Sequence, residues 1–237
     1  MKAMVFAAGI GSRLKEFTRE TPKCLIEVGG IPMLERVVER LKGAGVTSVV
    51  INVHHYADKV VHFVESRHKF GIEVVFSDEP TLLDTGGGLK KVARHFAAED
   101  AFIIHNADIF SDIDLKALVS AHRARGAIGT LAVMERPSQR GLHFALDNRL
   151  VGWTGEGAVA PEGTRVLAFC GVSVASSRIF EFMGEEDTFS IIKSYLAASR
   201  STGAVWGEVV TGREWTDIGT PEQLQALRDR LGVRERR

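Results

Sequence analysis

Two glycines and two basic residues near the N-terminus have the spacing of a loop that binds phosphate. An apolar run at residues 4–8 predicts a first strand, and Gly9 and Gly11 follow it directly. Glycine lets a backbone turn tightly and approach a ligand closely, and the N–H groups of such loops bind anions. Arg13 adds a planar, forked cation and Lys23 adds a point charge. We therefore predict that this loop binds a nucleoside triphosphate whose phosphates undergo chemistry.

Leu14 argues against two common glycine-loop motifs. The dinucleotide-binding fingerprint needs glycine or alanine three residues after Gly11, and leucine stands there. A P-loop that began at Gly9 would need its second glycine at the same position. The loop is therefore neither an NAD-type turn nor a Walker motif, which disfavours a dehydrogenase.

The stretch from Gly9 to Lys23 resembles the signature of the sugar-1-phosphate nucleotidylyltransferases, Gly-x-Gly-x-Arg-(Leu/Met)-x-Pro-x-Thr followed by Pro-Lys. It differs at Glu16, where the family has a proline that shapes the loop. The whole chain is similar to short members of the family, among them N-acetylmuramate 1-phosphate uridylyltransferases of cell-wall recycling and mannose-1-phosphate guanylyltransferase-like proteins. The matching positions are Gly9, Gly11, Arg13, Leu14, Thr18, Pro22 and Lys23.

Strand and helix patterns alternate in the first half of the chain. Strands are expected at residues 3–8, 48–53, 73–76 and 101–106, and helices around residues 34–41, 60–64, 89–96 and 115–122. This alternation predicts an α/β fold with a parallel sheet between two layers of helices. Later strands are expected at residues 129–134, 166–174, 205–209 and 215–218, with a hairpin across 144–153 and helices around 178–183, 189–198 and 224–231.

The family resemblance makes this fold more specific. It implies a doubly wound, mostly parallel, Rossmann-like sheet of the nucleotide-diphospho-sugar transferase type with a small β-rich sugar-binding lobe. It also implies one nucleotidyltransferase domain over residues 1–237, with a nucleotide-binding half at 1–110 and a sugar-phosphate-binding half at 111–237.

Two aspartates follow apolar strand patterns and are candidate metal ligands. Asp108 ends the strand near residue 106, and Asp217 precedes Gly-Thr at the start of a predicted helix. Mg²⁺ is held by one or two carboxylates together with substrate phosphate oxygens. The resemblance implies the same Mg²⁺ ligands, Asp108 and Asp217. Asp112 and Asp114 stand before a predicted helix, where a capping role is favoured.

The other nucleotide contacts come from the resemblance. It implies that the backbone at Ala7 and Ala8, together with Gly9 and Gly11, lies against the nucleotide. It further implies that the glycine-containing turn at Thr85, Gly86 and Gly87 contacts the base and ribose. A flexible turn before a helix is the alternative for these last three residues.

Three residues are candidates for sugar binding. Asn106, two residues before Asp108, can hydrogen-bond a sugar hydroxyl. The family places a glycine beside the sugar at the position of Gly171. Arg140 is a candidate for the sugar phosphate, with an ordinary loop role as its alternative.

The net charge and the cysteine count limit the binding partners and the compartment that we expect for this protein. Lysine and arginine number 30, as do aspartate and glutamate, so the net charge is zero and neither nucleic acid nor a membrane surface is expected as a partner. Two cysteines in 237 residues predict no disulfide framework, which favours a cytoplasmic protein. The basic end at residues 234–237 is expected to be a solvated tail.

The expected reaction is condensation of a nucleoside triphosphate, with UTP favoured, and a sugar 1-phosphate to give an NDP-sugar and pyrophosphate. Two alternatives stay open. One is GTP- or CTP-dependent transfer to mannose or heptose 1-phosphate or another phosphorylated alcohol. The other is a non-catalytic nucleotide-binding regulator. Both a monomer and a homodimer are compatible with the sequence.

Overall fold

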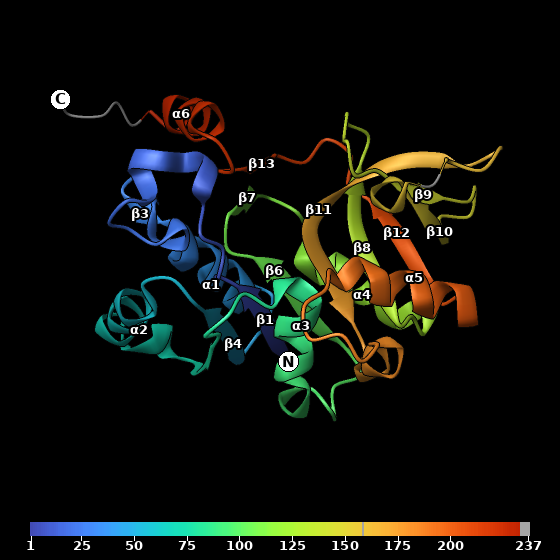
Figure 1. The fold of residues 1–237 in the computed structure, drawn as a ribbon, viewed down its shortest axis with the longest axis horizontal. Helices are drawn as coiled ribbons and strands as arrows, with labels where there is room; N and C mark the ends of the chain where they lie inside the picture. Colours follow the sequence, from blue (N-terminus) through green and yellow to red (C-terminus); the bar gives the residue numbers. More distant parts are fainter. Residues whose placement is uncertain (158, 233–237) are drawn as a thin grey trace.

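Four adjacent parallel strands form one half of a nine-stranded sheet in the computed structural model, which describes residues 1–157 and 159–232 (Figure 1). The strand order is β10-β9-β11-β6-β1-β4-β5, and β8 pairs with both β11 and β12. The parallel strands are β1 (Lys2–Phe6), β4 (Ser48–Val53), β5 (Glu73–Asp78) and β6 (Phe102–Asn106). The others are β8 (Gly129–Met134), β9 (Leu142–Phe144), β10 (Leu150–Trp153), β11 (Arg165–Ala175) and β12 (Val205–Val209).

Alternate residues of the central strands enter two separate cores. On β1, Val5 packs in a core with α1 (Met33–Gly43), α2 (Ala57–Ser66) and α4 (Leu115–Arg125), whereas Met4 packs in a core with α3 (Asp84–Lys91) and α5 (Ile191–Thr202). Every residue of β4 is buried, as expected for a parallel strand covered on both faces. The expected α/β fold, with a parallel core between helices, is confirmed.

The strand β11 changes the character of the sheet, because it pairs antiparallel with β6, β8 and β9. Its register shifts between Phe169 and Ser173, and Gly171 in this bulge has a φ of 71°. Its first residues pair with β9, and β9 pairs with β10, so these strands form the small β-rich lobe. The sheet is therefore parallel in the first half of the chain and mixed in the second.

The C-terminal segment returns from the second half to the N-terminal loop, as Figure 1 shows for β13 (Trp215–Asp217) and α6 (Pro221–Arg230). The strand β13 pairs with β7 (Ile109–Ser111), outside the main sheet. The α6 side chains Leu224 and Leu227 pack with Leu14 near two short strands, β2 (Glu27–Val28) and β3 (Ile31–Pro32). Burial of these apolar side chains brings the two ends of the chain together.

Some elements differ from the sequence expectation. The expected helix around residues 178–183 is a short 3₁₀ helix, Ser177–Phe182. The short strands β2, β3 and β7 have too few residues to give a periodic pattern. Asp114 caps α4 as expected, and Thr220 caps α6. The basic end at 234–237 lies outside the described residues, and within the described residues no helix is long and apolar enough to cross a bilayer.

Two of the three glycines in α3, Gly86 and Gly87, allow another segment of the chain to cross the helix closely. The N–H of Gly86 donates to the carbonyl of Phe189 at 2.8 Å. A Cβ atom on Gly86 would lie 2.2 Å from the Phe189 ring, and one on Gly87 would lie 1.9 Å from the Asp187 carbonyl oxygen. The close approach that the glycines permit is therefore to residues 187–189 of the same chain.

We expect Gly87→Ala to lower the free energy of unfolding by about 2 kcal/mol or more, because the new methyl group overlaps backbone that cannot rotate away. Urea unfolding followed by circular dichroism measures this change. Gly43→Ala is the matched control, since a Cβ there meets nothing within 4 Å and should be neutral or stabilising. Equal stability of the two variants would contradict the crossing.

Acid stability should depend on His122, whose ring is buried and whose Nδ1 lies 3.1 Å from the hydroxyl of Thr130. Burial lowers the pKa of His122 from 6.5 to about 4. Between pH 6.5 and pH 4 the ring is protonated in the unfolded chain but neutral in the folded chain. The contribution of His122 to the free energy of unfolding is therefore complete above pH 6.5 and falls towards pH 4. From pH 7 to pH 5 we expect the wild type to lose about 2 kcal/mol more than His122→Gln. Parallel urea curves with equal losses would contradict this assignment.

Candidate active site

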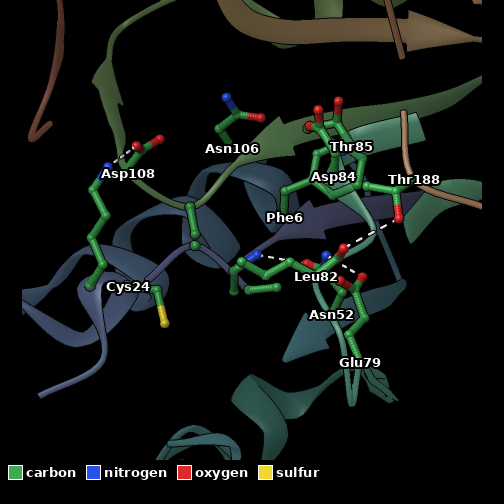
Figure 2. Close-up of a pocket in the computed structure, with 15 residues that line it drawn as sticks. Phe6, Cys24, Asn52, Glu79, Leu82, Asp84, Thr85, Asn106, Asp108 and Thr188 are labelled. Atoms are coloured by element: carbon green, nitrogen blue, oxygen red, sulfur yellow. Dashed lines mark hydrogen bonds and ion pairs between the residues drawn. The ribbon is translucent and has the colours of Figure 1, made fainter. Parts of the chain in front are cut away.

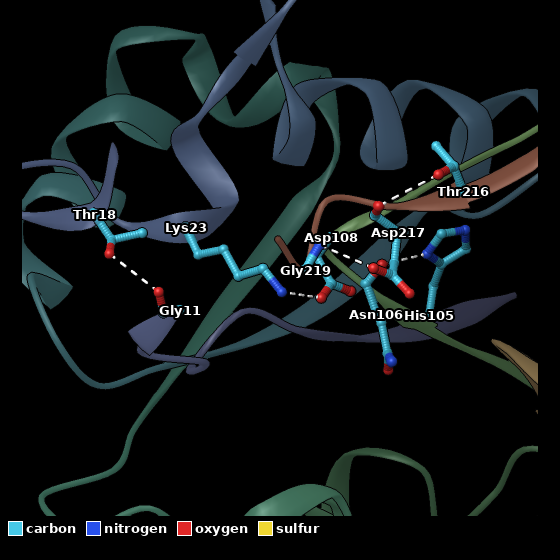
Figure 3. Close-up of polar contacts among 9 residues, drawn as sticks. All are labelled: Gly11, Thr18, Lys23, His105, Asn106, Asp108, Thr216, Asp217 and Gly219. Carbon is cyan, nitrogen blue, oxygen red and sulfur yellow. Dashed lines mark hydrogen bonds and ion pairs between the residues drawn. The ribbon is translucent and has the colours of Figure 1, made fainter. Parts of the chain in front are cut away.

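The glycine loop after β1 is held by contacts within the loop. Gly11 has a φ of 71°, and a Cβ atom there would lie 2.8 Å from Cγ2 of Thr18. The hydroxyl of Thr18 donates to the Gly11 carbonyl at 3.1 Å, which Figure 3 shows. Lys15, next to the proline position that Glu16 occupies, also has a positive φ of 46°. The loop therefore turns sharply at a non-glycine residue without the family's proline.

Lys23 and Asp108 form an ion pair at the edge of the sheet (Figure 3). Asp108 follows β6, and Lys23 begins a short 3₁₀ helix after the glycine loop. Their side chains are 13% and 25% exposed, so a ligand can still reach both groups. The structure thus joins two of the residues that the sequence singled out, although they lie 85 positions apart.

Asp217 reaches the same place through the pairing of β13 with β7. The N–H of Ile218 donates to the backbone carbonyl of Asp108 at 3.1 Å, and the N–H of Gly219 donates to Oδ1 of Asp217 at 2.9 Å. Nη2 of Arg13 lies 3.0 Å from the position that a Cβ atom on Gly219 would take. Arg13, Lys23 and the two aspartates therefore gather at one edge of the sheet.

The carboxylates of Asp108 and Asp217 at this edge of the sheet suit a hard cation that also binds phosphate oxygens. Among the described residues, no three histidine, cysteine, aspartate or glutamate side chains come together as a metal site. Asp108 and Asp217 offer carboxylate oxygens only, and Mg²⁺ commonly takes one or two carboxylates and completes its shell with phosphates and water. The residues present fit Mg²⁺.

A pocket of about 370 Å³ opens beside these charges, a size typical of small-ligand sites (Figure 2). Its wall includes Ala7, Ala8 and Gly9, and a Cβ atom on Gly9 would meet no protein atom within 4 Å. Thr85 lines the pocket, whereas Gly86 and Gly87 lie behind it against residues 187–189.

Asn52 and Glu79 are polar residues of this pocket that the sequence analysis missed. The Asn52 side chain accepts the N–H of Ala7 at 2.7 Å and donates to Oε1 of Glu79 at 2.8 Å (Figure 2). Oε2 of Glu79 accepts the N–H of Leu83 at 3.2 Å. The pair therefore ties the glycine loop to the opposite wall. The signal was the single asparagine in the otherwise apolar end of β4.

A second pocket of about 310 Å³ adjoins the first. Asn106 and Arg140 line it, and Gly171 lies beside Asn106, since a Cβ atom on Gly171 would be 2.9 Å from Nδ2 of that side chain. The structure thus brings the three sugar candidates to one region. Residues that line both pockets are Phe6, Asp84, Thr85 and Asn106.

Two titratable groups near the charged edge stay neutral. Burial lowers the pKa of His105 to about 4, and its Nδ1 lies 2.8 Å from the Asn106 carbonyl. Burial raises the pKa of the Cys24 thiol to about 12, so it is a poor nucleophile at neutral pH. Positive charge at this edge of the sheet therefore comes from Arg13 and Lys23.

The family model and the curated relatives that match this chain are all nucleotidyl transferases. A family model described as nucleotidyl transferase matches residues 2–145. A UTP–glucose-1-phosphate uridylyltransferase from Synechocystis sp. is 26% identical over 96% of this chain and 63% of that protein. A mannose-1-phosphate guanyltransferase from Gibberella zeae is 32% identical over 94% of this chain and 62% of that protein. The chain thus spans about three fifths of the length of these curated relatives.

Solved structures share the fold. HddC from Yersinia pseudotuberculosis, complexed with GMP-PN, has a TM-score of 0.75 at 21% identity, covering 97% of this chain and 98% of that one. A Bacillus anthracis protein in complex with sucrose has a TM-score of 0.82 at 20% identity, covering 99% and 96%. At these identities the likeness supports the fold alone.

We expect Asn52→Leu to destabilise the protein by about 2–4 kcal/mol, because it leaves the Ala7 N–H and a Glu79 oxygen buried without partners. Urea unfolding gives the energy. The matched control is Gln139→Leu, which also replaces a side-chain amide by leucine but at an exposed position. A loss below about 1 kcal/mol for Asn52→Leu would mean that water replaces both bonds.

Proposed function

The chain belongs to the nucleotidyl transferase family, and we propose that it joins a nucleoside triphosphate to a sugar 1-phosphate and releases pyrophosphate. The observation that carries the proposal is the gathering of Arg13, Lys23, Asp108 and Asp217 at one edge of the sheet, where Lys23 and Asp108 line the first of two adjoining pockets. Two adjoining pockets suit a reaction that joins two bound molecules, and the mixed charges beside the first pocket suit phosphate transfer.

In the proposed reaction, a phosphate oxygen of the sugar 1-phosphate attacks the α-phosphorus in line with the bond to pyrophosphate. The attacking oxygen is already anionic, so no general base is needed. Lys23 bridges the α-phosphate and the incoming phosphate, and Arg13 binds the leaving phosphates. These cations offset the charge that develops as the bond breaks, and positioning supplies most of the remaining acceleration.

Asp108 and Asp217 are the proposed ligands of Mg²⁺, which when bound supplies Lewis-acid stabilisation of phosphate charge. The ion pair between Lys23 and Asp108 holds the lysine at the same edge before substrates arrive. The N–H of Gly219, two residues after Asp217, donates to one oxygen of that carboxylate and orients it.

The proposed nucleotide subsite is the first pocket, with residues 1–110 supplying most of its wall. The proposed acceptor subsite is the second pocket, which residues 111–237 largely line. Nucleotide contacts are assigned to Ala7, Ala8, Gly9, Gly11 and Thr85, and sugar contacts to Asn106, Arg140 and Gly171. Gly86 and Gly87 lie behind the pocket and support its wall instead of contacting the nucleotide.

UTP is the favoured nucleotide, and the resemblance to N-acetylmuramate 1-phosphate uridylyltransferases supports it. GTP is the second candidate, because a relative at 32% identity is named a mannose-1-phosphate guanyltransferase. We further propose that the enzyme acts in the cytoplasm in cell-wall metabolism. The two cysteines, free and buried in this structure, agree with a reducing compartment.

The proposal is tested by pyrophosphate release with Mg²⁺, using five nucleoside triphosphates against a panel of sugar 1-phosphates. Asp108→Asn, Lys23→Ala and Arg13→Ala should each lower turnover by about 10²–10³-fold with little change in melting temperature, because each removes charge stabilisation from the reacting phosphates. Asp114→Asn is the matched control, since asparagine caps a helix as well as aspartate does.

Two results would contradict the proposal. Turnover in Asp108→Asn equal to that of the control would remove Asp108 from the reaction. Triphosphate binding by calorimetry, without pyrophosphate release for any pair of substrates, would favour a nucleotide-binding regulator.

A further inference from the structure

Arg136 follows β8 and lines the acceptor pocket, and an aromatic ring holds its side chain in place. Its guanidinium carbon lies 4.1 Å from the centroid of the Trp215 ring. Its Nη2 donates to the carbonyl of Phe169 at 3.1 Å. Stacking and one hydrogen bond fix the plane of the guanidinium and leave other donors available. Arg136 lines the same pocket as Asn106 and Arg140.

Trp215 is itself held firmly. Its indole N–H donates to the carbonyl of Cys170 at 2.8 Å, and the ring packs against the core that contains Val172. Trp215 lies in β13, two residues before Asp217. One three-residue strand therefore fixes both a carboxylate at the charged edge and the ring that orients Arg136.

The charge of Arg136 is incompletely paired. No carboxylate of residues 1–157 or 159–232 forms an ion pair with it, and its buried Nε has no hydrogen-bond partner there. Asp84, which also lines the pocket, accepts the N–H of Thr85 instead. A half-buried guanidinium costs free energy unless an anion pairs with it, and its fork matches the oxygens of a phosphate.

We propose that Arg136 binds the phosphate of the acceptor and that Trp215 is a positioning residue for it. This assignment rests on the proposed function, and it gives the acceptor pocket a fixed anion anchor. Arg140 lines the same pocket, but its side chain is exposed and has no aromatic partner among the described residues. On this assignment the acceptor is a phosphate monoester. Its phosphate pairs with the guanidinium of Arg136, which Trp215 of β13 orients.

Calorimetry without Mg²⁺ tests the assignment. The probes are glucose 1-phosphate, mannose 1-phosphate, the two free sugars, and UTP. We expect the wild type to bind at least one sugar 1-phosphate and neither free sugar. Arg136→Gln should weaken that binding by about 10- to 100-fold and change UTP affinity by less than about twofold. Arg136→Lys should recover part of the loss, because lysine keeps the charge without the planar fork.

Trp215 needs separate variants. Trp215→Phe keeps a ring beneath Arg136 and should weaken sugar 1-phosphate binding by less than about threefold. Trp215→Leu should approach the loss of Arg136→Gln while leaving UTP affinity unchanged. Melting temperatures verify that each variant folds, and Arg123→Gln, at an exposed ion pair outside the pocket, is the matched control.

Three outcomes would overturn the assignment. They are unchanged sugar 1-phosphate affinity in Arg136→Gln, equal losses of UTP and sugar 1-phosphate affinity, and no sugar 1-phosphate binding by the wild type. Pyrophosphate release by the wild type together with unchanged acceptor affinity in Arg136→Gln would overturn this assignment alone. If sugar 1-phosphate binding depends on Arg136 but no substrate pair releases pyrophosphate, the role of Arg136 would be supported and the proposed reaction contradicted.

Discussion

The charged edge of the sheet depends on the apolar contact between the C-terminal segment and the N-terminal loop. Leu14 in that loop is fully buried in a cluster with Ile218 and two leucines of α6. A two-stranded pair as short as β13 with β7 is marginal alone, and two neighbouring carboxylates repel. Burial of apolar surface therefore brings Asp217 to Asp108, and the nearby cations offset the repulsion.

A second constraint is the wall that the two pockets share. Thr85 lies in this wall at the start of α3, and its hydroxyl accepts the N–H of Ile191 at 3.0 Å. The glycines that follow let residues 187–189 cross the helix closely, so one connection positions both pockets. Since the pockets adjoin, ligands bound in each come near one another without a large movement of the fold.

Much of the fold and part of the site could be predicted from local patterns. The apolar strands and the helix cap at Asp114 lie where the sequence placed them, because burial and capping act over a few residues. Asp108 was identifiable because it ends an apolar strand. Arg136 was not identified, because its partner Trp215 is 79 positions away (215 minus 136) and no local pattern connects them.

The sequence by itself determined the chemical inventory of this protein: a glycine loop with two cations, two aspartates at strand ends, and an alternating pattern that makes a parallel sheet. Only the tertiary structure decided which of these groups meet. It paired Lys23 with Asp108, placed Gly86 against Phe189, and set Arg136 on Trp215. The physical reason is that residue type and periodicity act locally, whereas contacts between distant segments follow from how their apolar surfaces are buried together.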